Sequence, residues 1–311
     1  MVVFAVILYL GFTLYSGSES VFEALKALPA HVWGVILFFS LFNYGLRYWR
    51  WHLYIRRSEK TSISHIKHCA IYIAGFSLTM TPGKAGEAMR SLYLKQQGVS
   101  HQTTLAALFV ERIMDLLAVL LLAALGLSLL DGKQAAIATG FTVLLIVVCI
   151  VMVKLPWARV LKWRWVNHLP TKVIHILQFI AAMLANANKL VATPYFLLGL
   201  LIGLIAWGFE GYGLHLVMME YTHQPIEVSV SVAVYSIAVL LGAIAFLPGG
   251  LGGTEAAMVF MLIKLGFSPA EATAITFICR IATLWFAIVL GIVVMFMMSC
   301  LGLKPVLQEE V

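Results

Sequence analysis

Two glutamate–arginine pairs occur at one spacing in two distant parts of the chain. Glu87 stands 25 positions before Arg112, and Glu255 stands 25 positions before Arg280. All four lie in or beside apolar sequence, where an ionisable side chain is costly and is therefore a functional candidate. An arginine there can hold a phosphate through two parallel hydrogen bonds, and a glutamate can carry a proton because burial disfavours its charged form. The pairs predict a site that binds phosphate and exchanges protons.

The segments around these pairs form an internal repeat. Alignment of Glu87 with Glu255 without a gap gives 11 identical residues over the 36 positions from 87 to 122. Apolar bias alone would not bring glutamate, glycine, serine and arginine into register. One alternative remains for the glutamates, because a carboxylate in the first turn of a helix stabilises the helix dipole. Their repetition in both halves favours the functional interpretation.

Two further acidic residues belong to the candidate site. Asp115 follows Arg112 by three positions, which is the spacing of an ion pair on one helix face. Thr283 stands at the equivalent place after Arg280, so Arg280 is expected to lack such a partner and to suit a phosphate. Glu210 lies inside a long apolar run and is either another proton-exchanging group or a polar side chain satisfied by a neighbouring helix.

Glycines at two Pro-Gly breaks would let the backbone approach a ligand closely and would leave helix N-termini free to bind an anion. These glycines are Gly83, Gly86, Gly249, Gly250, Gly252 and Gly253. Lys84 and Arg90 add positive charge to the first break, where they are expected to attract headgroups to the cytoplasmic mouth. Arg47 and Arg50 lie among aromatic residues, a pattern typical of interfacial anchors, with headgroup recruitment as the alternative.

The composition excludes an ordinary soluble enzyme. Of the 311 residues, 62% are hydrophobic and 11% are charged, and the mean hydropathy is +0.96. Soluble domains contain roughly 45–50% apolar and about 25% charged residues. The net charge of +7 is attributed to basic loops and not to a nucleic-acid surface. The nine histidines and four cysteines show no metal-ligand spacing, so no metal and no cofactor is expected.

Eight apolar runs predict an all-α polytopic membrane protein with a single transmembrane domain over residues 1–311. The runs are Val2 to Tyr15, His31 to Tyr54, Ile66 to Met80, Leu105 to Leu130, Gln134 to Val153, Pro194 to Met218, Ile226 to Leu247 and Glu271 to Ser299. Basic residues cluster after the second and the fifth run, and the positive-inside rule assigns both loops to the cytoplasm. Three runs lie between these loops, so one of the three cannot cross the membrane fully.

The run from Ile66 to Met80 is the short one, since it covers about 22 Å of a roughly 30 Å hydrocarbon core. It is expected to return after Thr81-Pro82-Gly83 as a re-entrant hairpin. The run from Ile226 to Leu247 and the helix after its glycines form a second hairpin by analogy, although this run is long enough to span. About six full spans result, with both termini in the cytoplasm.

Three crossings separate the hairpins, so the two copies, about residues 66–130 and 226–299, are expected to be inverted relative to each other. Inverted repeats with broken helices that meet near the midplane are a transporter architecture. Residues 171–192 have one apolar and one polar face and predict an amphipathic helix on the inner surface. Extension of the following span is the alternative.

Three ordered motifs resemble the flippase-like membrane domain of lysylphosphatidylglycerol synthetases. They are Pro82-Gly83-Lys84-Ala85-Gly86-Glu87-Ala88-Met89-Arg90, Glu111-Arg112-Ile113-Met114-Asp115-Leu116, and Pro248-Gly249-Gly250-Leu251-Gly252-Gly253-Thr254-Glu255 with Arg280. The resemblance runs from about Asn43 to Gly291. It implies a membrane part that moves an aminoacylated lipid to the outer leaflet, while a separate soluble part, which this sequence lacks, makes that lipid. Stand-alone members look like translocases of lipids or polyprenyl phosphates, and the paired hairpins resemble DedA-type transporters in architecture.

The sequence therefore predicts a lipid translocase of a bacterial-type inner (cytoplasmic) membrane and not an enzyme. Its substrate is expected to be an anionic, phosphate-bearing lipid whose headgroup is held by Arg112, Arg280 and helix N-termini, with Glu87 and Glu255 coupling the movement to protons. Membrane lipids are the expected partners, and lipid-synthesis enzymes are candidate ones. Two alternatives remain, namely an intramembrane enzyme that acts on lipid headgroups and a scaffold for lipid-synthesis enzymes.

Overall fold

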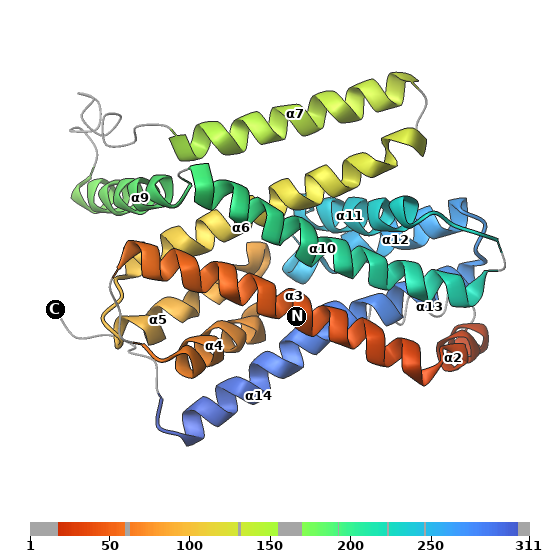
Figure 1. Cartoon of the computed structure of the whole chain (residues 1–311), viewed down its shortest axis with the longest axis horizontal. Coiled ribbons are helices and arrows are strands. Elements are labelled where there is room, and N and C mark those ends of the chain that lie inside the picture. The colour runs from red at the N-terminus through yellow and green to blue at the C-terminus, as the bar shows by residue number, and fades with distance from the viewer. Residues whose placement is uncertain are drawn as a thin grey trace.

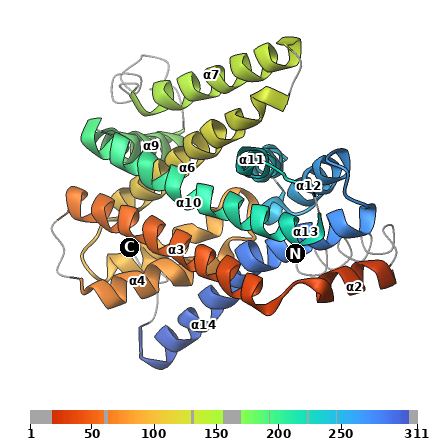
Figure 2. The ribbon, with the colours of Figure 1, turned by 45° about the vertical axis from the view of Figure 1, so that its right-hand side comes forward.

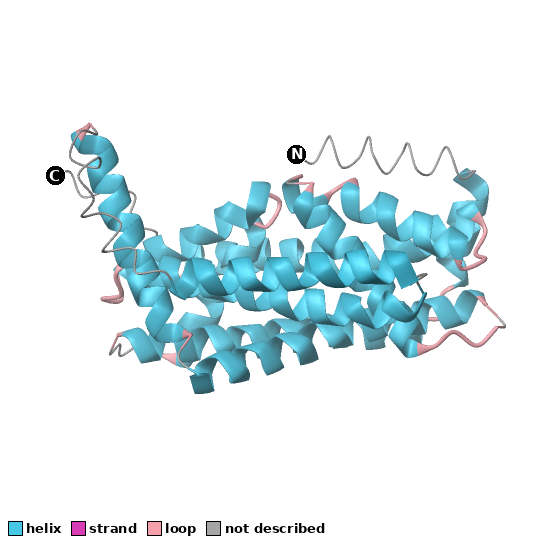
Figure 3. Ribbon diagram, turned by 90° about the horizontal axis from the view of Figure 1, so that it is seen from above, coloured by secondary structure: helices cyan, strands magenta, loops and turns pink. Residues whose placement is uncertain are grey.

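Every element of regular structure in the described part of the chain is helical (Figure 3), which confirms the predicted helical class. The computed structural model describes residues 18–59, 63–129, 132–154, 170–191, 193–222, 224–245 and 247–303. The first apolar run, the basic loop at 155–169 and both termini lie outside the described residues. The side chain of Lys84 and the surroundings of Gly83 lie outside them too.

Long helices run along the length of the molecule (Figure 1). They are α3 (Ala30–Ser58), α6 (His101–Ala123, continued by the 3₁₀ turn η3, Ala124–Leu129), α7 (Gly132–Lys154) and α10 (Thr193–Tyr221). The short helix α2 (Ser18–Ala27) meets α3 at an angle of 83°. The chain ends its described part with α13 (Pro269–Arg280), a π-helical turn η6 (Ile281–Trp285) and α14 (Phe286–Cys300).

Three described helices are long and apolar enough to cross a membrane, namely Val173–Leu190, Pro194–Tyr221 and Pro269–Cys300, and the bent pair of α2 and α3 would make a fourth. α6 carries Glu111, Arg112 and Asp115 near its middle, which lowers its hydropathy. Glu111 and Asp115 are buried inside the protein, so their charges do not face lipid. The six full spans stay a prediction.

Both expected hairpins are present as reversals of the chain. The first is formed by α4 (His65–Ala74), the 3₁₀ turns η1 (Gly75–Leu78) and η2 (Pro82–Met89), and α5 (Arg90–Lys95). The second is formed by α11 (Val228–Ile244), η5 (Pro248–Gly250) and α12 (Gly253–Lys264), with α11 beside α12 (Figure 2). The tips η2 and η5 contact each other. Gly249 and Gly252 have φ of +62° and +90°, so the second tip needs glycine to turn.

The two hairpins lie toward opposite ends of the molecule. α3, which precedes the first hairpin, and α10, which precedes the second, run in opposite directions beside each other (Figure 1). The local structure that follows the first hairpin also matches the local structure that follows the second. Gly98 and Gly266 both have positive φ, and Ser100 and Ser268 both cap the N-terminus of the next helix. Both helices that follow the hairpins therefore begin with the same type of cap.

The helix predicted to lie on the inner surface is α9 (Thr171–Leu190). It is seen nearly end-on in Figure 1, whereas α6, α7 and α10 lie across the view. A helix so inclined to the long helices would lie along a membrane that those helices cross. The same residues satisfy the length and composition of a span, so the interfacial assignment stays a prediction.

Candidate functional site

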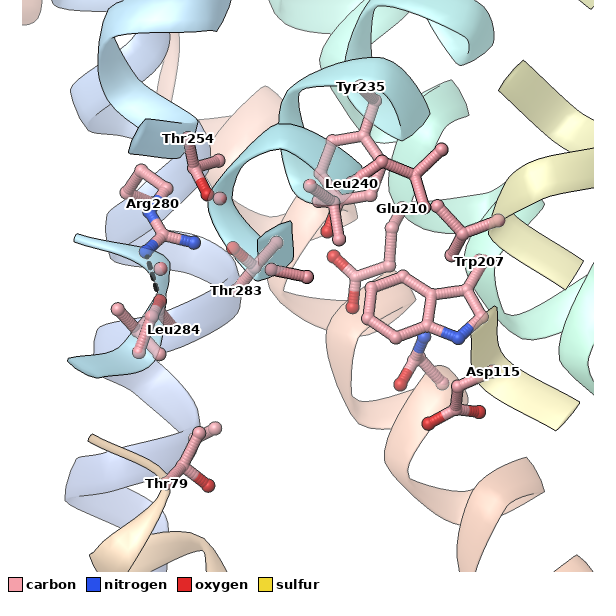
Figure 4. Close-up of a pocket in the computed structure, with 18 of the residues that line it drawn as sticks. Thr79, Asp115, Trp207, Glu210, Tyr235, Leu240, Thr254, Arg280, Thr283 and Leu284 are labelled. Atoms are coloured by element: carbon pink, nitrogen blue, oxygen red, sulfur yellow. Dashed lines mark hydrogen bonds between the residues drawn. The ribbon is translucent and has the colours of Figure 1, made fainter. Parts of the chain in front are cut away.

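A cavity of about 330 Å³ lies where the hairpin tips face α3, α6 and α10 (Figure 4). This volume falls within the roughly 300–1,000 Å³ that is typical of ligand pockets. Residues singled out in the sequence from both halves of the repeat line it: Glu87, Arg112, Asp115, Glu210, Gly249, Gly250 and Arg280. Folding thus brings the two repeated motifs to one place.

The glutamate and arginine of the second repeat form a buried ion pair. Arg280 Nε donates to Glu255 Oε1 at 2.6 Å, and Arg280 Nη2 donates to the Gly249 carbonyl at 2.9 Å. The expectation that Arg280 would lack a partner is therefore wrong, because its partner comes from the preceding helix and not from its own. Glu255 Oε2 also accepts the backbone N–H of Gly252 at 2.7 Å. The helix-capping role and the pairing role coexist in one carboxylate.

The same pair exists in the first repeat. Arg112 Nη2 donates to Glu87 Oε2 at 3.1 Å, which Arg90 Nη2 also approaches at 2.9 Å. Thr79 Oγ1 donates to Glu87 Oε1 at 3.0 Å. The two pairs join equivalent residues of the repeat, and each links a hairpin to the helix that follows it. Arg112 is the more accessible arginine of this group, with 25% of its side chain exposed.

The expected pair between Arg112 and Asp115 is present but long. Arg112 Nη1 lies 3.8 Å from Asp115 Oδ2, whereas Arg47 Nη2 lies 3.1 Å from that oxygen and Arg50 Nη2 lies 2.5 Å from Oδ1. Arg47 and Arg50 are buried, so the prediction that they are interfacial anchors is wrong. They point from α3 into the protein because acidic partners on α6 compensate their charge.

Glu111 is a functional candidate that sequence reasoning missed. It is fully buried and accepts from Arg47 at 3.2 Å, Arg90 at 3.4 Å and the Tyr72 hydroxyl at 2.5 Å. Arg112 Nη2 lies 3.3 Å from the same carboxylate. The arginines and carboxylates of this region form what we call the first-repeat cluster: Arg47, Arg50, Arg90, Arg112, Glu87, Glu111 and Asp115. A polar stripe on α3 at Ser40, Asn43, Arg47 and Arg50 was the signal that could have revealed it.

Several residues predicted to bind the substrate lie away from the cavity. Arg90 is completely buried and donates to the Tyr72 carbonyl at 3.1 Å, so its predicted place at a cytoplasmic mouth is wrong. Gly86 packs against Leu78, where an added Cβ would lie 2.5 Å from the Leu78 side chain. Gly253 packs against Gly242 in the same way. These glycines allow the hairpin arms to approach closely.

α3 and α10 contribute equivalent positions to the cavity. Each helix has 29 residues, and the fourteenth residues touch, because Asn43 Nδ2 donates to the Ala206 carbonyl at 2.9 Å. The fifteenth residues, Tyr44 and Trp207, both line the cavity. So do the eighteenth, which are Arg47 in α3 and Glu210 in α10. The two helices therefore present opposite charges at the same position.

Nearly the whole chain is also similar in sequence to a known protein family. The model of the family described as the lysylphosphatidylglycerol synthase transmembrane region matches residues 2–291. The chain belongs to this family. The family and the apolar helices together indicate an integral membrane protein.

Two curated relatives are UPF0104 membrane proteins of the archaeon Methanothermobacter thermautotrophicus. One is 29% identical over 94 residues, which is 30% of this chain and 28% of the relative. The other is 29% identical over 91 residues, which is 29% of this chain and 27% of the relative. The matched stretches thus span little more than a quarter of either relative. Both relatives are named as membrane proteins, and neither name states an activity.

Proposed function

We propose that this protein moves a phosphate-bearing lipid between the two leaflets of a membrane. The observation that carries the proposal is the cavity itself, where both repeated ion pairs meet among long apolar helices. Arginines beside such a cavity suit a phosphate because each can give two parallel hydrogen bonds. Apolar residues of the same cavity, including Leu240, Leu247 and Leu284, offer a surface for lipid chains.

The arrangement of the helices supports alternating access. The hairpins lie toward opposite ends of the molecule, and α3 and α10 are antiparallel helices of equal length. Equivalent residues, Asn43 and Ala206, meet at their crossing. This is the relation expected of inverted repeats on a two-fold axis, and two such halves can exchange roles to open the cavity to either side. In this proposal both hairpins are re-entrant and the protein resides in a cytoplasmic membrane.

Binding and proton exchange would be linked through the ion pairs. A phosphate that binds to Arg112 and Arg280 competes with Glu87 and Glu255 for those arginines. A carboxylate that loses its arginine in apolar surroundings favours its protonated form. Entry of the headgroup would then be accompanied by proton uptake. Release of the headgroup would let the ion pairs form again and would return the protons to the solution.

The proposal is tested by leaflet transfer in vesicles that contain the purified protein. Arg280→Ala and Glu87→Gln should abolish the accelerated transfer while the variants remain folded. The matched controls are Arg56→Ala and Glu220→Gln, because both residues are exposed and lie outside the cavity. Wild-type rates in both cavity variants would refute the assigned roles. Conversion of a lipid in detergent, where no leaflets exist, would favour an enzyme instead.

A further inference from the structure

Counted as ionised, the buried and partly buried charges around the cavity balance one another among the described residues. The arginines are Arg47, Arg50, Arg90, Arg112 and Arg280, and the carboxylates are Glu87, Glu111, Asp115, Glu210 and Glu255. The first-repeat cluster holds four arginines and three carboxylates, so it carries one positive charge in excess. The second repeat and α10 hold Arg280, Glu255 and Glu210, so they carry one negative charge in excess.

The excess positive charge and the excess negative charge come from equivalent positions on α3 and α10, where the two helices carry residues of opposite charge. Arg47 brings a positive charge to one side of the cavity, and Glu210 brings a negative charge at the equivalent position of α10. A headgroup phosphate adds negative charge to the cavity, and unbalanced charge away from water is costly. Either a proton taken up by Glu87 or Glu255 or a positive group on the headgroup itself can compensate it. A headgroup that carries both signs would preserve the balance.

The surroundings of Glu210 suit a positively charged group. Its carboxylate stands beside the Trp207 ring and on the side of the cavity opposite Arg280 (Figure 4). Tyr44 and Tyr235 line the same cavity. The Trp207 and Tyr235 rings lie 6.3 Å apart. Aromatic rings next to a carboxylate attract an ammonium group through their electron-rich faces.

We propose that the transported headgroup is zwitterionic, with its phosphate toward Arg112, Arg280 and Arg47 and a single ammonium group toward Glu210. This inference rests on the proposed lipid transfer and names the substrate class for it. Glu210 is then the residue that determines specificity between zwitterionic and anionic lipids. Its equivalent, Arg47, sets the orientation of the headgroup in the cavity.

The test measures leaflet transfer of four lipids by wild-type protein in vesicles. Three carry the same fluorescent acyl chain, namely phosphatidylethanolamine, phosphatidylcholine and phosphatidylglycerol, and the fourth is a labelled polyprenyl phosphate. Wild-type protein should move at least one zwitterionic lipid about tenfold faster than phosphatidylglycerol, a difference of about 1.4 kcal/mol. Glu210→Gln should remove this preference, and Glu210→Asp should retain it. Glu220→Gln removes an exposed carboxylate from the same helix and should change nothing.

Each outcome separates the two proposals. Faster transfer of phosphatidylglycerol or of polyprenyl phosphate than of either zwitterionic lipid would overturn the zwitterion inference and keep the translocase. An unchanged preference in folded Glu210→Gln protein would also overturn it. Absence of accelerated transfer for all four lipids would refute the translocase itself. The melting temperature and elution profile of each variant show whether it is folded.

Discussion

Replacement of Glu111 by glutamine should destabilise the protein strongly. The fully buried carboxylate receives charged donors from Arg47, Arg112 and Arg90 and a hydroxyl from Tyr72. Without its charge the first-repeat cluster changes from four arginines and three carboxylates to four arginines and two. Loss of one partner from a buried ion pair costs about 3–5 kcal/mol, because an uncompensated charge is left inside.

The assay is equilibrium unfolding of the purified protein in detergent. Glu111→Gln should lower the free energy of unfolding by about 3–5 kcal/mol, and the exposed Glu220→Gln should stay within about 0.5 kcal/mol of wild type. A loss below about 1 kcal/mol for Glu111→Gln would contradict the reasoning, since it would fall within the range of exposed ion pairs.

The second repeat supplies a compensating variant. The residues equivalent to Arg90 and Glu111 in the gapless alignment are Met258 and Cys279, and Cys279 is buried. The double variant Arg90→Met with Glu111→Cys copies this apolar pair into the first repeat. It should be more stable than Glu111→Cys alone, with a coupling of about 0.5–3 kcal/mol. Additive single effects would show that Glu111 does not act through Arg90.

Three further predictions concern the hairpins and their supports. Gly291→Ala should destabilise the protein by about 1–3 kcal/mol, since the new Cβ would lie 2.9 Å from a backbone carbon of η1. The control Gly34→Ala, at an exposed position with open space around it, should not destabilise the protein. Equal unfolding free energies of the two variants would refute the close contact. Gly249→Ala should cost about 1–2 kcal/mol because its φ is +62° and side chains disfavour that region; unchanged thermal unfolding would refute the strained tip. Burial tends to raise the pKa of the Glu59 carboxyl, but hydrogen bonds from Ser100 outweigh it and hold the pKa below the ordinary value of 4.5. Wild-type protein should therefore have a higher free energy of unfolding than Glu59→Gln above about pH 4.5, and this difference should vanish as the pH falls through the folded-state pKa of Glu59. A difference between the two proteins that grows on acidification would refute the prediction.

Much of the site was predictable because it follows from linear spacing. The positions of Glu87, Arg112, Glu255 and Arg280 repeat in the chain, and repeated motifs fold into equivalent local structures. The N-caps at Ser100 and Ser268 depend only on the next few residues. Such local rules also predicted both reversals of the chain from their proline and glycine residues.

The partners of the charged side chains were not predictable in the same way. The spacing rule that pairs Arg112 with Asp115 considers one helix, whereas the shorter contacts of both residues come from other segments. Aromatic neighbours suggested an interface for Arg47 and Arg50, but the direction of a helix face depends on what packs against it. The role of Glu111 could not be predicted from its position beside Arg112, since its other contacts come from α3, α4 and α5.

The amino-acid sequence by itself determined that this is an apolar, helical chain with two reversals at Pro-Gly breaks and a glutamate–arginine pair at one spacing after each break. Hydropathy, turn residues and spacing act locally, so they can be read along the chain. Only the tertiary structure decided that the arginines are paired, that α3 and α10 place Arg47 and Glu210 at matching positions, and that one cavity joins them. Charge compensation acts through space between distant segments, and its pattern exists only once those segments have packed together.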